Sequence, residues 1–165
     1  MSAILVASLM GNNRPGLLKD LAAKTHELGG KWLTSKVNHL DDQISALIKV
    51  ELPQPQVQPL KDIFNNEPAI CAVFSEGEPT PPPSSIVEMV VDSSDRAGIV
   101  NEITQVLDSE SIELVDMDCQ RIGVAELGRS VFTARLMLKV PNSLKSEELA
   151  EELEGIADDM VVTVV

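Results

Sequence analysis

A short loop with residue types that suit the binding of small anions occurs twice in this chain. The first copy runs Asn12-Asn13-Arg14-Pro15-Gly16-Leu17-Leu18, and the second runs Ser94-Asp95-Arg96-Ala97-Gly98-Ile99-Val100. The copies align without a gap at an offset of 82 residues, about half of the 165-residue chain. Each follows an apolar run and precedes a run with helical spacing, which predicts a connection from a strand to a helix.

Both loops are suited to hold a carboxylate. Proline presets φ for a first helical turn, and glycine lets a ligand come close to the backbone. The N–H groups at the start of a helix then point outward and favour a negative charge. A turn that binds no ligand is the alternative that these residues leave open. The predicted ligand-binding residues are Asn12, Asn13, Arg14, Pro15, Gly16 and Leu17, with Asp95, Arg96, Ala97, Gly98 and Ile99 in the second copy.

The elements around the two loops are predicted to follow one order. In the first half the pattern predicts strands at 3–10, 32–39, 44–52 and 69–74, with helices at 15–28 and 57–64. In the second half it predicts strands at 86–91, 112–122, 130–140 and 161–165, with helices at 97–107 and 146–160. Each half therefore reads β-α-β-β-α-β. This order predicts an α+β fold of the ferredoxin-like type, an antiparallel sheet with helices on one face.

The repeat predicts two small domains. Domain 1 is expected at 1–77, a Pro-rich linker at 78–84 and domain 2 at 85–165. In polyproline II form the linker would hold the halves about 20 Å apart. A lone unit of about 75 residues covers its sheet edge and sheet face poorly, so we expect the halves to pack together.

Charge and composition argue against nucleic acid and membrane partners. The net charge is −13, with 7 basic and 9 acidic residues in 1–78 but 6 basic and 17 acidic residues in 79–165. Such a surface repels a phosphate backbone, and three Phe, one Trp and no Tyr leave little to stack on bases. No apolar run approaches the ~18 residues of a membrane span, and the N-terminus lacks a signal-peptide pattern. We expect a soluble, cytoplasmic protein.

The sequence shows no constellation for catalysis, metal binding or a cofactor. His26 and His39 have no Cys or Asp at ligand or triad spacing, and no glycine-rich nucleotide loop is present. Cys71 and Cys119 are expected to be buried, reduced thiols. The carboxylates of the last predicted helix are expected to form a solvated face; they are Glu147, Glu148, Glu151, Glu152, Glu154, Asp158 and Asp159.

The two loop motifs resemble the signature of ACT domains, small regulatory modules that bind amino acids. Asn-Arg-Pro-Gly-Leu-Leu and Asp-Arg-Ala-Gly-Ile-Val each stand at the first strand-to-helix turn of a β-α-β-β-α-β unit. Two such units joined by a Pro-rich linker, with no enzymatic domain, resemble the glycine cleavage system transcriptional repressor family. The resemblance implies that the amino and carboxylate groups of a ligand are held by the loop and by the start of the second strand.

Carried over by position, the loop Asn of the family matches Asn13 and, as an acidic variant, Asp95. We expect Asp95 to weaken binding of a carboxylate unless a cation such as Arg96 offsets it. The Asn that often follows the first helix in the family is replaced by Lys31 and Glu113.

The resemblance implies a non-catalytic regulator that senses a small amino acid, glycine or serine. It would act indirectly, through contact with a DNA-bound transcription regulator, and as a homo-oligomer. Two alternatives remain: a protein-interaction module without a ligand, and a small ferredoxin-like enzyme. The missing catalytic constellation argues against the enzyme.

Overall fold

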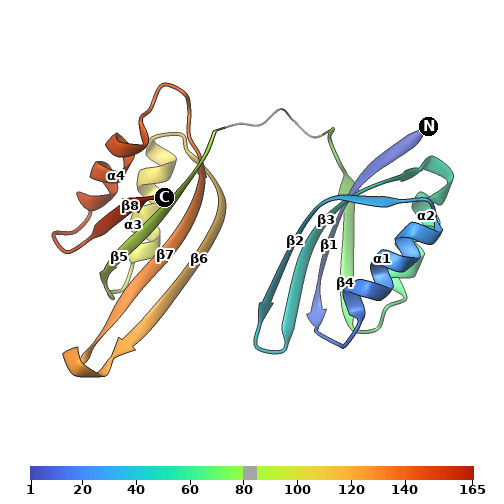
Figure 1. Cartoon of the computed structure of the whole chain (residues 1–165), viewed down its shortest axis with the longest axis horizontal. Coiled ribbons are helices and arrows are strands. Elements are labelled where there is room, and N and C mark those ends of the chain that lie inside the picture. Colours follow the sequence, from blue (N-terminus) through green and yellow to red (C-terminus); the bar gives the residue numbers. More distant parts are fainter. Residues whose placement is uncertain (80–84) are drawn as a thin grey trace. The chain divides into compact units, whose positions relative to one another are not determined.

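The computed structural model describes residues 1–79 and 85–165. The chain divides into two compact units, Met1–Pro81 and Pro82–Val165, hereafter unit 1 and unit 2 (Figure 1). Each unit has one four-stranded antiparallel sheet with its helices on a single face. The predicted α+β fold with two ferredoxin-like repeats is thereby confirmed. Residues 80–84 of the predicted linker, and with them the polyproline II spacing, lie outside the described residues.

Unit 1 contains six regular elements and one short turn of 3₁₀ helix. In its sheet the strands lie in the order β2-β3-β1-β4, so the two outer connections cross over through the helices. The elements are β1 (Ser2–Asn12), α1 (Leu17–Glu27), β2 (Lys31–Leu40), β3 (Gln43–Pro53), η1 (Gln54–Gln56), α2 (Val57–Asn65) and β4 (Ile70–Glu76).

Unit 2 repeats this order with a longer hairpin. Its strands lie in the order β6-β7-β5-β8, which matches unit 1 strand for strand. The elements are β5 (Ile86–Ser94), α3 (Ile99–Ser109), β6 (Glu113–Val124), η2 (Ala125–Leu127), β7 (Arg129–Lys139), α4 (Ser146–Glu154) and β8 (Val161–Val164).

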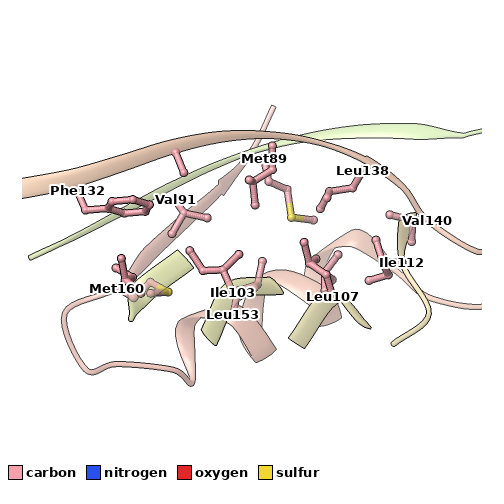
Figure 2. Close-up of a cluster of buried hydrophobic side chains, with 14 residues drawn as sticks. Met89, Val91, Ile103, Leu107, Ile112, Phe132, Leu138, Val140, Leu153 and Met160 are labelled. Atoms are coloured by element: carbon pink, nitrogen blue, oxygen red, sulfur yellow. The ribbon is translucent and has the colours of Figure 1, made fainter. Parts of the chain in front are cut away.

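Alternation along the strands builds each core between sheet and helices. In β3 every second residue from Ile44 to Leu52 is buried, and on the helices Leu21 and Phe64 are fully enclosed. Alternate side chains of each strand point to the opposite face of the sheet, which no helix of the unit covers. In unit 2 the sheet residues Met89 and Phe132 pack against Ile103 from α3 and Leu153 from α4 (Figure 2).

The last helix is shorter than its apolar spacing predicts. It ends at Glu154 and not at residue 160. Ile156 and Met160 still pack against the core, but from the loop that leads into β8. Asp158 and Asp159 therefore do not belong to the solvated face of α4.

The expectation of two buried cysteines is wrong. Cys71 is exposed and Cys119 is partly exposed, and both are free thiols. In β4 the residues Ile70 and Ala72 face the helices, so Cys71, which lies between them, faces the uncovered side of the sheet. Among the described residues no helix is long and apolar enough to cross a membrane.

Candidate functional site

The loop of unit 1 presents an open corner of backbone. Gly16 caps α1 with φ of 76°, in the left-handed region that favours glycine, and a Cβ placed there would meet nothing within 4 Å. Leu17 is buried and fixes the first turn to the core. Within the described residues, the N–H groups of Leu18 and Lys19 donate to no backbone carbonyl. This corner can therefore donate to an incoming carboxylate.

Backbone hydrogen bonds hold the loop on both sides. The Asn12 N–H donates to the Ala69 carbonyl at 3.0 Å, and the Asn13 N–H donates to the Asp42 carbonyl at 2.8 Å. The Gln43 side chain donates to Asn12 Oδ1 at 2.7 Å. The loop is thus tied to the start of β4 and to the β2–β3 hairpin, while the side chain of Asn13 stays exposed.

Arg14 braces the loop from within unit 1. Its Nε donates to Glu67 Oε1 at 3.1 Å and its Nη2 to Glu67 Oε2 at 2.7 Å, which makes a bidentate pair. Its Nη1 donates to Asp20 at 2.9 Å and to the Pro15 carbonyl at 3.1 Å. The hydrogen bonds to Glu67 and Asp20 raise the pKa of Arg14, and those from Arg14 lower the pKa of Glu67, which is buried. This geometry ties the predicted ligand-binding residue Arg14 to carboxylates of its own unit.

The loop of unit 2 has the same backbone but different neighbours. Gly98 caps α3 with φ of 84°, and a Cβ there would again meet nothing within 4 Å. Within the described residues, the first N–H groups of α3, from Ile99 to Asn101, donate to no backbone carbonyl. The Asp95 N–H donates to the Ser130 carbonyl at 3.1 Å, which ties the loop to the β6–β7 hairpin.

The cation that offsets Asp95 is not the one the sequence suggests. Arg96 pairs with Glu102 through both guanidinium ends, one contact being 2.9 Å, and this pairing raises the pKa of Arg96 and lowers that of Glu102. Arg121 of β6 instead donates to Asp95 Oδ1 at 2.8 Å. The expectation for Arg96 is therefore wrong, because its position in the turn directs it to the carboxylate six residues ahead.

Asp159 holds the start of the second loop. Its Oδ2 accepts the Ser94 N–H at 3.1 Å, and its Oδ1 accepts the Ser93 hydroxyl at 3.3 Å. These bonds, Ser94 foremost, lower the pKa of Asp159. Glu67 in unit 1 and Asp159 in unit 2 both precede the last strand of their unit, so in each unit the connection into that strand supplies one carboxylate to the loop.

Three residues of these sites escape a reading of the sequence. Glu67 is 53 residues from Arg14, Asp159 is 65 residues from Ser94, and Arg121 is 26 residues from Asp95. The signal that could have found the two acids is their position just before a terminal strand that lies beside the first strand of its unit.

The second contact implied by the resemblance is not beside the loop within either unit. Lys31 begins β2 after the C-terminal end of α1, whereas the loop lies at the N-terminal end. An 11-residue helix separates the two ends by about 16 Å. Glu113 lies in the same way beyond α3. The loops alone therefore form the candidate sites of single units.

The described part of the chain shows little that indicates catalysis or metal binding. His26 on α1 and His39 on β2 are exposed. Within residues 1–79 and 85–165, no group of three or more His, Cys, Asp or Glu residues is placed to hold a metal ion.

Comparisons with known proteins agree with this geometry. The model of the ACT domain family matches residues 3–66, which include the loop and most of unit 1. The chain is similar in structure to an unknown protein from Galdieria sulphuraria, with a TM-score of 0.85 and 18% identity over 100% of this chain and 99% of that one. Among curated protein sequences none matches.

A second solved structure is of a protein whose assignment as a glycine cleavage system transcriptional repressor is itself provisional. The TM-score is 0.74 at 15% identity, over 100% of this chain and 98% of that one. Identities this low establish a shared fold and no more. Together with the family match, which lies within unit 1, they show that unit 1 resembles ACT domains and that the whole chain shares its fold with this protein.

Proposed function

Because the chain is a tandem of two ACT-like units, we propose that it is a non-catalytic regulator that senses a small amino acid. The observation that carries the proposal is the loop of unit 1. It combines free N–H groups beside an open Gly16 with an exposed Asn13, on a backbone held from both sides. A ligand carboxylate would accept from the N–H groups of Leu18 and Lys19, and the amide oxygen of Asn13 would accept from the ligand ammonium.

The ligand is expected to be glycine or serine. The resemblance to a glycine cleavage repressor supports the same choice. The corresponding loop of unit 2 would bind more weakly, because Asp95 places a second carboxylate beside the ligand's and the ion pair with Arg121 offsets only part of its charge.

Control of transcription would be indirect. A net charge of −13 repels duplex DNA, and no described helix carries a cluster of Lys or Arg. The protein would bind a DNA-bound regulator instead, with the acidic second half facing a basic patch on it. The amino acid would favour one of two arrangements that differ in their ability to bind that regulator.

Calorimetric titration with glycine and with serine tests the ligand. Asn13→Ala should weaken binding by about 1–3 kcal/mol, the scale of a hydrogen bond to a charged group. Gly16→Val should abolish binding in unit 1, since its side chain fills the open corner. Asn142→Ala, a change in an exposed loop of unit 2, is the matched control and should leave the affinity unchanged.

These titrations distinguish an amino acid sensor from a protein-interaction module that binds no ligand. Unchanged affinity in both Asn13→Ala and Gly16→Val would remove the site from this loop. If the wild-type protein takes up neither amino acid, it is an interaction module without a ligand.

A gel-shift titration tests the route to the gene. We expect the protein to shift a promoter fragment of the glycine cleavage genes only with the DNA-bound regulator present, and glycine to change that shift. A shift by this protein alone at near-physiological salt would contradict the indirect route.

A further inference from the structure

A cavity of about 480 Å³ lies in unit 1 at the end of the sheet that is farther from the loop. It is lined by the first residues of β1, the last residues of β4, and α2 with the 3₁₀ turn before it, and is hereafter the α2–β4 cavity (Figure 1). Leu5 of β1 lines it, whereas Asn12 ends the same strand at the loop. The strand spans about 23 Å between these two residues, so the cavity and the loop are separate places.

The floor of the α2–β4 cavity is apolar and packed against the core. Leu5 is buried, and Val57 of α2 and Phe74 of β4 are half-buried. The centre of the Phe74 ring lies 5.9 Å from that of Phe64, with an angle of 54° between the ring planes. Because Phe64 is fully buried, this contact holds the Phe74 ring in place. The cavity therefore offers a preformed surface to an apolar group.

Lys61 of α2 places a positive charge at this apolar floor. Its Nζ is 5.9 Å from the centre of the Phe74 ring, and its side chain is half-buried. Within residues 1–79 and 85–165 the lysines that form ion pairs are Lys31 and Lys139, so Lys61 has no carboxylate partner there. A partly desolvated ammonium group is stabilised by an opposite charge nearby. Lys61 is thus available to an anionic group whose apolar part lies on Phe74.

A carboxylate also lines the α2–β4 cavity. Glu76 of β4 is exposed, and in the part of the chain that the structure describes it forms no ion pair with Lys61 or with another cation. A ligand with a second negative charge would bring that charge toward Glu76 and be repelled. The cavity therefore favours a ligand with a single negative charge.

Unit 2 has neither the ring nor the cation at the corresponding positions. Val164 of β8 has the register position that Phe74 has in β4. Ala150 follows the first buried leucine of α4, as Lys61 follows that of α2. The shared fold therefore does not require an aromatic ring and a lysine at this end of a unit.

We propose that the α2–β4 cavity binds a small monocarboxylate with an aromatic or branched apolar body. The carboxylate pairs with Lys61, and the apolar body lies on Phe74 and Val57. The volume falls in the range of small-molecule sites, roughly 300–1,000 Å³, and is sufficient for one ring with a short side chain. This site needs no ammonium group on its ligand and is independent of the function proposed for the loop.

An NMR titration of the isotope-labelled full chain with phenylacetate tests the site. We expect saturable shifts of the backbone amide signals of Lys61, Phe74 and Gly77, whereas those of Gly16 and Leu18 stay in place. Phenylacetamide, which is neutral, and phenylsuccinate, which carries a second carboxylate, bind at least about tenfold more weakly, because one loses the charge-assisted bond and the other meets Glu76.

Three variants show which residue holds the probe. Lys61→Met keeps an apolar stem without the charge and raises the dissociation constant of phenylacetate at least about tenfold. Lys36→Met, the same change at an exposed lysine of β2 outside the cavity, leaves it unchanged. Gly16→Val also leaves it unchanged, so a failure of the loop site and a failure of this site are distinguishable.

The amide spectra recorded in these titrations also show that each variant is folded. No saturable shift at the α2–β4 cavity, equal affinity for phenylacetate and phenylacetamide, or a Lys61→Met variant that binds as tightly as the wild type would each overturn the proposal.

Discussion

The two loops reach one backbone geometry through different supports. In unit 1, Gly11 lets the Ala69 carbonyl come so close that a Cβ at this position would lie 2.1 Å from its oxygen. In unit 2 the corresponding residue is Ser93, whose hydroxyl donates to Asp159. The left-handed glycine caps agree within 8° of φ, at 76° and 84°. The turn is therefore the shared element of the repeat, and the bracing around it has diverged.

The difference extends to the charge that each loop presents. Unit 1 offers the neutral Asn13 while Arg14 is held by two carboxylates of its own unit. Unit 2 offers Asp95 with Arg121 beside it. Two sites built on one turn can thus differ in affinity without any difference in backbone.

The largest effect on stability is expected when Gly11 of unit 1 is replaced by serine, the residue that unit 2 has at the corresponding position 93. Gly11→Ser should destabilise unit 1 by about 3 kcal/mol, because its Cβ forces the Ala69 backbone away. The single tryptophan, Trp32, lies in unit 1, so its fluorescence during denaturant unfolding reports on that unit. Ser93→Gly is the reciprocal control and should leave the Trp32 transition in place. An unchanged denaturation midpoint in Gly11→Ser would mean that the close approach of the Ala69 carbonyl to position 11 does not contribute to the stability of unit 1.

Removal of the buried carboxylate of unit 1 is expected to have a smaller effect that depends on pH. Glu67→Gln should lower the stability of unit 1 by about 2 kcal/mol at neutral pH, since Arg14 loses a charged partner. The pKa of Glu67 is lower in the folded chain than its ordinary value, so its contribution is present above the unfolded pKa and is lost as pH falls through the folded one.

Acid unfolding followed by Trp32 fluorescence checks this dependence. The difference between wild type and Glu67→Gln should shrink as pH falls below the ordinary pKa of a glutamate and should vanish below the lowered pKa of Glu67. Glu102→Gln, which removes the carboxylate partner of Arg96 in unit 2, should leave the Trp32 signal unaffected. A difference that is constant from neutral to acidic pH would show that Glu67 acts through packing and not through its charge.

Replacement of the charged loop residue of unit 2 by the neutral residue of unit 1 should make the affinities of the two sites more alike. In a Gly16→Val background, where only the loop of unit 2 can bind, Asp95→Asn should strengthen glycine binding by about 1 kcal/mol. The change removes a carboxylate and leaves Arg121 without its partner. Calorimetric titration measures the gain, and a weaker affinity would mean that Asp95 holds the ligand ammonium.

The smallest effect concerns the hairpin beside each loop. Unit 1 turns through Asp41 with φ of 52°, and unit 2 turns through Gly128 with φ of 60°. Asp41→Gly should relieve backbone strain and change the stability of unit 1 by only about 0.5 kcal/mol, because glycine also loses more entropy on folding. Gly128→Asp should destabilise unit 2 by a similar amount. Thermal unfolding followed by circular dichroism compares the two.

The fold was predictable because it depends on periodicity and repetition. Alternation in β3 and helical spacing from Leu17 to Leu21 are local signals, and the second copy confirmed the order of elements. The error in α4 has a local cause as well: apolar spacing continues to Met160, but the helix ends at Glu154. Spacing alone cannot distinguish a helix from a loop that packs its side chains into the same core.

The supports of the loops were not predictable in the same way. Glu67 and Asp159 act from the connections that precede β4 and β8, on residues more than 50 positions away in the sequence. The expectation that Asp159 belongs to a solvated face followed from counting acids on the predicted helix. The exposure of Cys71 likewise depends on which face of the sheet the helices cover, and periodicity does not decide that.

The brace on Arg14 has a consequence for how binding would appear in a calorimeter. Because Glu67, Asp20 and the Pro15 carbonyl already fix this side chain, the loop has lost most of its conformational freedom before any ligand arrives. Association then needs little ordering of the protein, so the entropic penalty is small and the rate of binding is set by diffusion and orientation. A preformed corner of this kind would respond to rapid changes in ligand concentration without a slow conformational step.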